Sequence, residues 1–202
     1  KGIAVGSGLI DLNLDVDVLY SRLNRTWKRT LKKISVDNIS VRLEKLNDDR
    51  LEQILESQSN MQSVKGFKGI DGDLIQALSK LQSREFGFDI FVAEMIDCDG
   101  QVIELGYRVC LKHGNTATDF LLWLNEDGKK YSASTALYWQ AIFHYKDLGY
   151  RWFDIGGLTE NTTKGIAAYK KGLRSELYTL IGEWRYYNIP NPFWKIIEIL
   201  QK

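Results

Sequence analysis

The sequence predicts a mixed α/β domain whose sheet is mostly antiparallel and carries helices on both faces. Three neighbouring segments are rich in strand-forming residues and lie at 86–97, 102–112 and 117–124. The turn signals Asp99-Gly100 and Gly114-Asn115 separate them, which predicts an antiparallel meander. A helical period at 133–148 and a strand-like run at 150–155 follow. A meander followed by a strand–helix–strand crossover gives a mixed sheet with helices on its faces.

The N-terminal part predicts helices around one short strand. Residues 17–34 predict a single helix, because apolar residues recur there at spacings of three and four. These apolar residues are Tyr20, Leu23, Trp27, Leu31 and Ile34. Alternating apolar residues predict a strand at 39–43. Asp48 has the character of an N-cap for the next helix, and residues 73–83 predict a further short helix.

The C-terminal part continues the alternation of helix and strand. Gly149 is placed to end the 133–148 helix as a left-handed cap. A short helix is expected at 164–171 and a last strand at 176–187. Pro192 then predicts the start of a closing helix.

Length and composition favour one soluble domain spanning residues 1–202. The chain has 202 residues, of which 44% are hydrophobic, and domains typically run about 100–200 residues. Its 27 basic and 26 acidic residues give a net charge of +1, which argues against a surface built as a whole for nucleic acid or an anionic membrane. No apolar run approaches the ~20 residues of a membrane span. The first residue is Lys1 rather than methionine, so we expect a piece excised from a longer chain.

The two cysteines are expected to lie far apart. Folding the strands about the Asp99-Gly100 turn places Cys98 beside Gln101 and Cys110 near Asp89. The thiols would then be roughly 30 Å apart, at about 3.4 Å per residue. A disulfide is therefore not expected, and the chain fits a reducing cytoplasm.

The most specific motif follows the strand of the crossover. Asp154 lies near the carboxyl end of that strand, where sheets of this kind bind ligands. Gly156 and Gly157 let the backbone turn sharply and approach a ligand. Lys170 follows Tyr169 on the next helix, where its charge can neutralise a phosphate. The same residues also fit a surface turn with a solvated lysine.

The predicted helix at 17–34 has a strongly basic face. Its cations are Arg22, Arg25, Lys28, Arg29, Lys32 and Lys33. Such a face is compatible with plain solvation. It is also compatible with a cationic wall for a nucleotide, coenzyme A or tRNA, in which Arg29 and Lys32 would face the ligand.

Two separated motifs resemble the signature of the Fem-type (FemABX-like) transferases and their GNAT-like acetyltransferase relatives. The first motif comprises Phe153-Asp154, Gly156-Gly157, Gly165-Ile166, Tyr169-Lys170 and Gly172. The second is the run Trp27-Lys28-Arg29-Thr30-Leu31-Lys32-Lys33, which is similar to an aromatic–Arg–x–x–Leu–Arg–Lys helix. The resemblance covers roughly residues 9–187 and implies a GNAT-like fold.

The resemblance implies transfer of an amino acid from aminoacyl-tRNA, or of an acyl group, to an amine. Acceptors in the family are often cell-envelope precursors. The lysine at position 170 is implied to contact the phosphate-bearing donor, with the aromatic residue at position 169 beside it.

The chain also departs from the family pattern. Tyr169 stands where phenylalanine is more usual, Leu173-Arg174-Ser175 replaces Phe-Gly-Gly, and Ile34 replaces an alanine. Only one of the two GNAT-like halves common in the family is present, and the helical hairpin of some tRNA-using members is missing. An acceptor site formed between two halves would therefore be incomplete.

The segment before the 133–148 helix lacks the glycine-rich coenzyme A motif of GNAT enzymes. It reads Asn125-Glu126-Asp127-Gly128-Lys129-Lys130-Tyr131-Ser132-Ala133-Ser134 instead. Lys129, Lys130, Ser132 and Ser134 could hold a phosphate at the helix N-terminus. The alternative is that Ser132 or Ser134 is an ordinary N-cap.

Candidate general bases are Asp119, Glu126 and Asp127, among which the sequence does not choose. Neither His113 nor His144 has a zinc-ligand spacing, so no metal site is expected. The sequence thus predicts a cytoplasmic N-acyltransferase, with acyl-CoA as the favoured donor and an amino sugar or cell-envelope precursor as a candidate amine acceptor. The alternatives are an aminoacyl-tRNA-dependent transferase of the peptidoglycan-bridge type and a non-catalytic binding module derived from a transferase half.

Overall fold

A computed structural model describes residues 6–66, 69–158 and 162–180, which form a seven-stranded sheet in the order β2-β3-β4-β5-β6-β1-β7. The strands are β1 (Gly6–Asp11), β2 (Ser40–Glu44), β3 (Phe86–Ile96), β4 (Val102–His113), β5 (Thr116–Leu124), β6 (Trp152–Asp154) and β7 (Glu176–Thr179). The helices are α1 (Val16–Arg22), α2 (Arg25–Val36), α3 (Asp48–Lys65), α4 (Gly72–Ser79), α5 (Glu126–Lys130), α6 (Ala133–Asp147) and α7 (Lys164–Lys171).

The predicted meander is confirmed. Strands β3, β4 and β5 pair in antiparallel order through turns at Gly100 and Gly114, whose positive φ angles of 77° and 60° are accessible to glycine at little cost. Asp89 pairs with Cys110, as the sequence predicts, and both cysteines are free. Gly149, with a φ angle of 79°, follows the end of α6 as expected.

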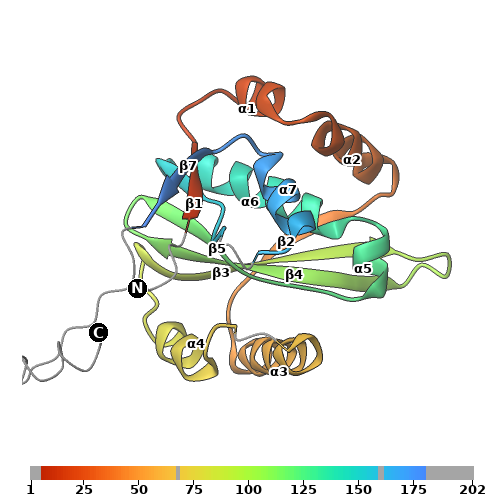
Figure 1. Ribbon diagram of the computed structural model, residues 1–202. Coiled ribbons are helices and arrows are strands. Elements are labelled where there is room, and N and C mark those ends of the chain that lie inside the picture. The colour runs from red at the N-terminus through yellow and green to blue at the C-terminus, as the bar shows by residue number, and fades with distance from the viewer. Residues whose placement is uncertain (1–5, 67–68, 159–161, 181–202) are drawn as a thin grey trace, which may run out of the picture.

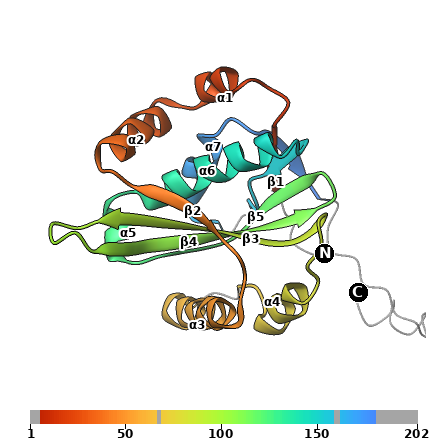
Figure 2. The same ribbon diagram turned by 180° about the vertical axis from the view of Figure 1, so that it is seen from behind.

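Helices cover both faces of the sheet (Figures 1 and 2). Helices α3 and α4 lie against one face, where an apolar cluster includes Ile54, Ile75 and Val109. On the other face, α1, α2, α6 and α7 enclose a second cluster centred on α6. The predicted class, a mixed and mostly antiparallel sheet with helices on both faces, is confirmed.

The N-terminal elements differ from the prediction in three places. The helix expected at 17–34 is two helices, because α1 ends at Arg22 and Asn24 caps the second by accepting a hydrogen bond from the Trp27 N–H at 2.9 Å. Strand β1 is an element that the sequence does not predict. The N-cap of α3 is Asn47 rather than Asp48, since its side chain accepts from the Arg50 N–H at 2.8 Å.

The other predicted elements keep their places with shifted bounds. The strand expected at 150–155 is shorter, and the helix expected at 73–83 is α4. Residues 164–171 form the predicted short helix. The later part of the 176–187 strand and the helix expected after Pro192 lie outside the described residues. No helix within the described ranges combines the length and hydrophobicity needed to cross a bilayer.

The pairing of β5 positions the site. Strand β5 pairs with the parallel strand β6 only through Thr116–Thr118, where the register is Thr118 opposite Asp154. Beyond that point β5 continues beside β4 alone, with a register shift opposite Val109 and Cys110. Within the described residues, the second edge of β5 from Asp119 to Leu124 therefore has no strand partner, and the sheet opens there.

Candidate functional site

A cleft of about 830 Å³ lies where β5 parts from β6. Its walls come from β5, from the first turn of α6, from α7 and from one face of α3. The polar residues that line it are Thr30, Ser57, Asn60, Arg108, Asp119, Lys129, Ser132, Ser134, Thr135, Tyr138, Tyr169 and Lys170. Ligand pockets typically measure about 300–1,000 Å³, so the cleft has the size of a substrate site.

Helix α7 carries Lys170 into this cleft. The helix begins at the N-cap Thr163, whose side chain accepts from the Ile166 N–H at 3.4 Å. Only 14% of the Lys170 side chain is exposed. Its ammonium donates to the Gly157 carbonyl oxygen at 3.4 Å and lies 3.7 Å from Asp119 Oδ2. Burial lowers the pKa of Lys170, Asp119 opposes that lowering, and Arg108 adds to it. Lys170 is thus not a fully solvated side chain.

Arg108 and Asp119 form a buried ion pair on the floor of the cleft. Arg108 projects from β4 and is 1% exposed, and its Nη1 contacts Asp119 Oδ1. Its guanidinium carbon lies 4.1 Å from the centre of the Tyr138 ring. Asp119 therefore contacts two cations, Arg108 on one side and Lys170 on the other. Of the three predicted candidate bases, Asp119 alone lines the cleft.

The hydroxyl groups beside this pair form a second chain of polar contacts. Arg108 Nη2 donates to Ser134 Oγ at 3.3 Å, and Ser134 donates to the Tyr169 hydroxyl at 3.1 Å. The Tyr169 ring stacks on Trp27 of α2 with 4.7 Å between centroids, and Trp27 Nε1 donates to the Tyr169 carbonyl oxygen at 2.8 Å. Helix α2 is thereby fixed to α7. The extra hydroxyl of Tyr169, relative to phenylalanine, is what makes the bond to Ser134.

Asp154 has different surroundings from the other predicted site residues. Its carboxylate accepts from the Ser7 hydroxyl, from the Tyr178 hydroxyl and from the Gly156 N–H, the last at 2.8 Å. Burial and the bond to Asp154 raise the pKa of Tyr178 to about 12. Asp154 does not line the cleft. Its contacts instead hold the turn after β6.

Gly156 brings that turn close to the cleft floor. Its φ angle is 72°, and a Cβ added there would lie 2.5 Å from the Asp119 carbonyl oxygen and 3.2 Å from Lys170 Nζ. Gly157, which follows, lines the cleft and supplies the carbonyl that Lys170 contacts. The glycine pair therefore permits a close approach of the backbone to Lys170.

The first turn of α6 lines the cleft through Ser132, Ser134 and Thr135. Ala133 is fully buried, and the Thr135 N–H bonds to the Ser132 carbonyl oxygen at 2.9 Å. Helix α5, which precedes this turn, packs on β4 through Gly128, where an added Cβ would lie 2.0 Å from the Leu105 carbonyl oxygen. Ser132 occupies the N-cap position with a φ angle of 60° but its side chain makes no capping bond, and Ser134 bonds elsewhere. Ser132 is thus the N-cap residue, as one interpretation expected, although its side chain does not cap the helix, and Ser134 is not the N-cap.

The remaining candidates lie at the surface. Glu126 and Asp127 are exposed in the first turn of α5, where Glu126 pairs with Lys129. Arg29 and Lys32 are exposed on α2. Residues 18–36 contain six basic residues and no acidic one, and no carboxylate of the described chain forms an ion pair with them. Thr30 of the same helix lines the cleft, so this basic surface adjoins it.

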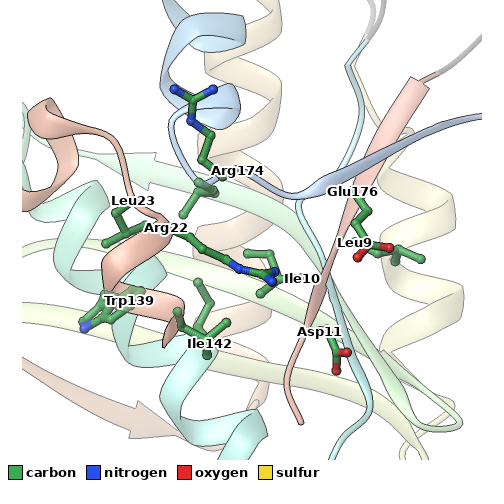
Figure 3. A pocket seen from close by; sticks show the side chains of 11 residues that line it. Leu9, Ile10, Asp11, Arg22, Leu23, Trp139, Ile142, Arg174 and Glu176 are labelled. Carbon is green, nitrogen blue, oxygen red and sulfur yellow. The ribbon is translucent and has the colours of Figure 1, made fainter. Parts of the chain in front are cut away.

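A second, much smaller cavity lies between β1, α1 and α6 (Figure 3). Arg22 extends across it toward Ile10, whereas Arg174 points away. Its volume is about 20 Å³, which is room for about one water molecule. It is too small for a substrate. Among the described residues, no group of three or more His, Cys, Asp or Glu side chains has an arrangement that could hold a metal ion.

The fold is GNAT-like, as its similarity to solved structures shows. FemX superposes with a TM-score of 0.75 at 12% identity, over 96% of this chain and 64% of that one. L-PGS from Bacillus licheniformis gives a TM-score of 0.61 at 11% identity, over 98% and 65% of the two chains. A tandem GNAT protein from the clavulanic acid biosynthesis pathway gives 0.52 at 14% identity, over 89% and 52%.

The family is also shown by sequence. The FemAB family model matches residues 30–202, and the chain belongs to this family, which confirms the resemblance seen in its two motifs. No curated protein sequence matches significantly. The chain spans less than two thirds of the length of these three matched structures.

Proposed function

We propose that this protein is an aminoacyl transferase that moves an amino acid from aminoacyl-tRNA to an amine of a cell-envelope precursor. The observation that carries the proposal is the position of Lys170. Its ammonium lies in the cleft beside the open edge of β5, in a chain of the FemAB family. A cation there can meet a phosphate or the charge that develops on a reacting carbonyl oxygen.

The open edge of β5 is suited to an extended donor end. Peptide N–H and C=O groups of a strand edge without a partner can bond to an elongated ligand in the manner of an added strand. Asp119–Leu124 all line the cleft, and Lys170 lies at the Asp119 end of this edge. A donor lying along β5 would bring its activated carbonyl toward Lys170.

Two features favour aminoacyl-tRNA over acyl-CoA as the donor. The segment before α6 lacks the glycine-rich coenzyme A motif of GNAT enzymes, which would help to hold a pyrophosphate at the helix N-terminus. The basic surface of α2 adjoins the cleft, and its cations, with no acidic residue between positions 18 and 36, suit a long polyanion. We therefore prefer the tRNA donor, although sequence composition favours acyl-CoA.

The chemistry requires no covalent intermediate on the protein. The acceptor nitrogen attacks the ester carbonyl carbon, a C–N bond forms, and the C–O bond to the tRNA ribose breaks. One proton leaves the nitrogen and the ribose oxygen takes up one. The protein's part is to hold the two substrates together, exclude water and stabilise the oxyanion, in which Lys170 is the proposed donor.

A donor-binding competition tests the proposal. The ligand is a short RNA hairpin ending in CCA, with its amino acid joined to the terminal ribose by a stable amide. We expect it to bind and acetyl-CoA not to displace it, as measured by fluorescence anisotropy. Binding of acetyl-CoA alone would instead favour the acyl-CoA donor. Binding of neither ligand would favour the non-catalytic binding module.

A further inference from the structure

At the floor of the cleft, the carboxylate of Asp119 lies closer to Arg108 than to Lys170. Asp119 Oδ1 is in close contact with Arg108, whereas Asp119 Oδ2 is 3.7 Å from Lys170. Arg108 is therefore the main partner of the carboxylate. Lys170 keeps a longer contact to Asp119 and one weak hydrogen bond to Gly157 at 3.4 Å. Its ammonium retains donor capacity for a ligand.

Stability alone does not explain a buried arginine at this place. Arg108 is 1% exposed, and its Nε–H has no hydrogen-bond partner among the described residues. Burying an ion pair is costly, and apolar residues in its place are often neutral or stabilising. The guanidinium contacts both polar arms of the site, Asp119 with Lys170 on one side and Ser134 with Tyr169 on the other.

We propose that Arg108 is a positioning residue that retains Asp119 as its own partner and so keeps Lys170 free to meet the donor. Without Arg108, Asp119 would turn to Lys170 and pair with it directly. Without Asp119, Lys170 would face Arg108 with no carboxylate between them. The charged groups that face Lys170 are Asp119 on β5, Arg108 on β4 and Asp154 on β6.

Arg108 and Asp119 therefore change the pKa of Lys170 in opposite directions. Arg108 lowers the pKa of Lys170 and Asp119 raises it. Arg108→Met should raise the pKa of Lys170, because a like charge is removed and a carboxylate is released. Asp119→Asn should lower that pKa, because the compensating negative charge is removed. A merely structural pair would give both variants the same kind of defect.

The test measures how fast a trace amount of an amine-reactive reagent labels Lys170 at pH values between 7 and 11. Peptide mass spectrometry quantifies the labelling, and its pH midpoint reports the pKa of Lys170. Only the neutral amine reacts, and each unit of midpoint shift changes the neutral fraction about tenfold below the midpoint. We expect Arg108→Met to move the Lys170 midpoint to higher pH and Asp119→Asn to move it to lower pH. The exposed neighbour Lys171 is the internal reference.

Arg50→Met is the matched control. Arg50 is also a buried arginine, paired with Glu44 and Glu104 on the opposite face of the sheet. Arg50→Met should destabilise the fold without moving the pH midpoint of Lys170 labelling. If Arg108→Met does not fold, Arg108→Gln removes the same charge while keeping some hydrogen bonding. Midpoints that move the same way in the Arg108 and Asp119 variants, or that stay at the wild-type value, would overturn the proposal.

The catalytic meaning of this arrangement rests on the proposed function, but the labelling needs no substrate. If transfer is observed, Arg108→Met should mainly raise the KM for the donor and shift the pH profile in the direction of the Lys170 midpoint. If the wild-type protein transfers nothing while the opposite shifts are found, the proposed function fails and the positioning role of Arg108 stands.

Discussion

Removing the Lys170 ammonium should weaken donor binding far more than it weakens the fold. Its contacts to Gly157 and Asp119, at 3.4 and 3.7 Å, are long, so Lys170→Ala forfeits little internal bonding. Asp119 retains Arg108 as a partner. We therefore expect a stability loss on the order of 1 kcal/mol, measured as a shift in the urea midpoint.

The expected loss in binding is larger. A charge-assisted hydrogen bond contributes about 1.5–3 kcal/mol, which at about 1.4 kcal/mol per decade is roughly a 10- to 150-fold change in Kd. The assay is anisotropy titration of the amide-linked RNA hairpin. Lys171→Ala is the control, because that side chain is exposed on the same helix. Equal, small effects of the two substitutions would refute the role given to Lys170.

Three further predictions concern the surroundings of the site. Replacing Arg29 and Lys32 by glutamine should weaken RNA binding and reduce the slope of log Kd against log salt, by about 0.7 for each phosphate that is no longer neutralised if the bound RNA is single-stranded. Gly156→Ala should lower the melting temperature and weaken donor binding, because its φ angle of 72° is strained for alanine and the new Cβ would meet a carbonyl oxygen at 2.5 Å. Tyr178→Phe should destabilise the protein below pH 10 and lose this effect as pH rises through 12, because burial and Asp154 raise the pKa of Tyr178 to about 12.

The direction of the Tyr178→Phe effect follows from the linkage between proton binding and folding. The tyrosine holds its proton more tightly in the folded state than at its ordinary pKa of about 10. The contribution is therefore complete below pH 10 and disappears as pH rises through 12. Wild type and variant should lose their difference in melting temperature over that interval. A constant difference across it would contradict the assignment, as would an unchanged salt slope for the α2 variant or an unaltered melting temperature for Gly156→Ala.

The sequence predicts the sheet and its helices well wherever local signals exist. The Asp99-Gly100 turn and the alternation of strand formers suffice for β3 and β4, because their pairing is local. Strand β1 has no such signal, since its partners β6 and β7 lie about 140–170 residues away along the chain. The break between α1 and α2 does have a signal in the sequence, the N-cap residue Asn24, which the apolar periodicity of 17–34 conceals.

The site is predictable in part. The motif identifies Tyr169 and Lys170, and the structure brings them together with Ser134 and Asp119. Arg108 is not predictable in this way, because it stands in the apolar middle of β4 and its partners belong to other elements. The motif places Asp154 beside the ligand, whereas the hydroxyl groups of Ser7 and Tyr178 that bind its carboxylate come from distant strands.

The measurement that bears most directly on the proposed activity is a transfer assay under single-turnover conditions. Purified protein is mixed with tRNA charged with isotope-labelled amino acids and with amine-bearing cell-envelope precursors. We expect one equivalent of amino acid to appear in amide linkage on the precursor for each tRNA deacylated, and Lys170→Ala to slow this step while Lys171→Ala does not. Acylation of the same precursors from acetyl-CoA, with charged tRNA left intact, would contradict the proposed activity.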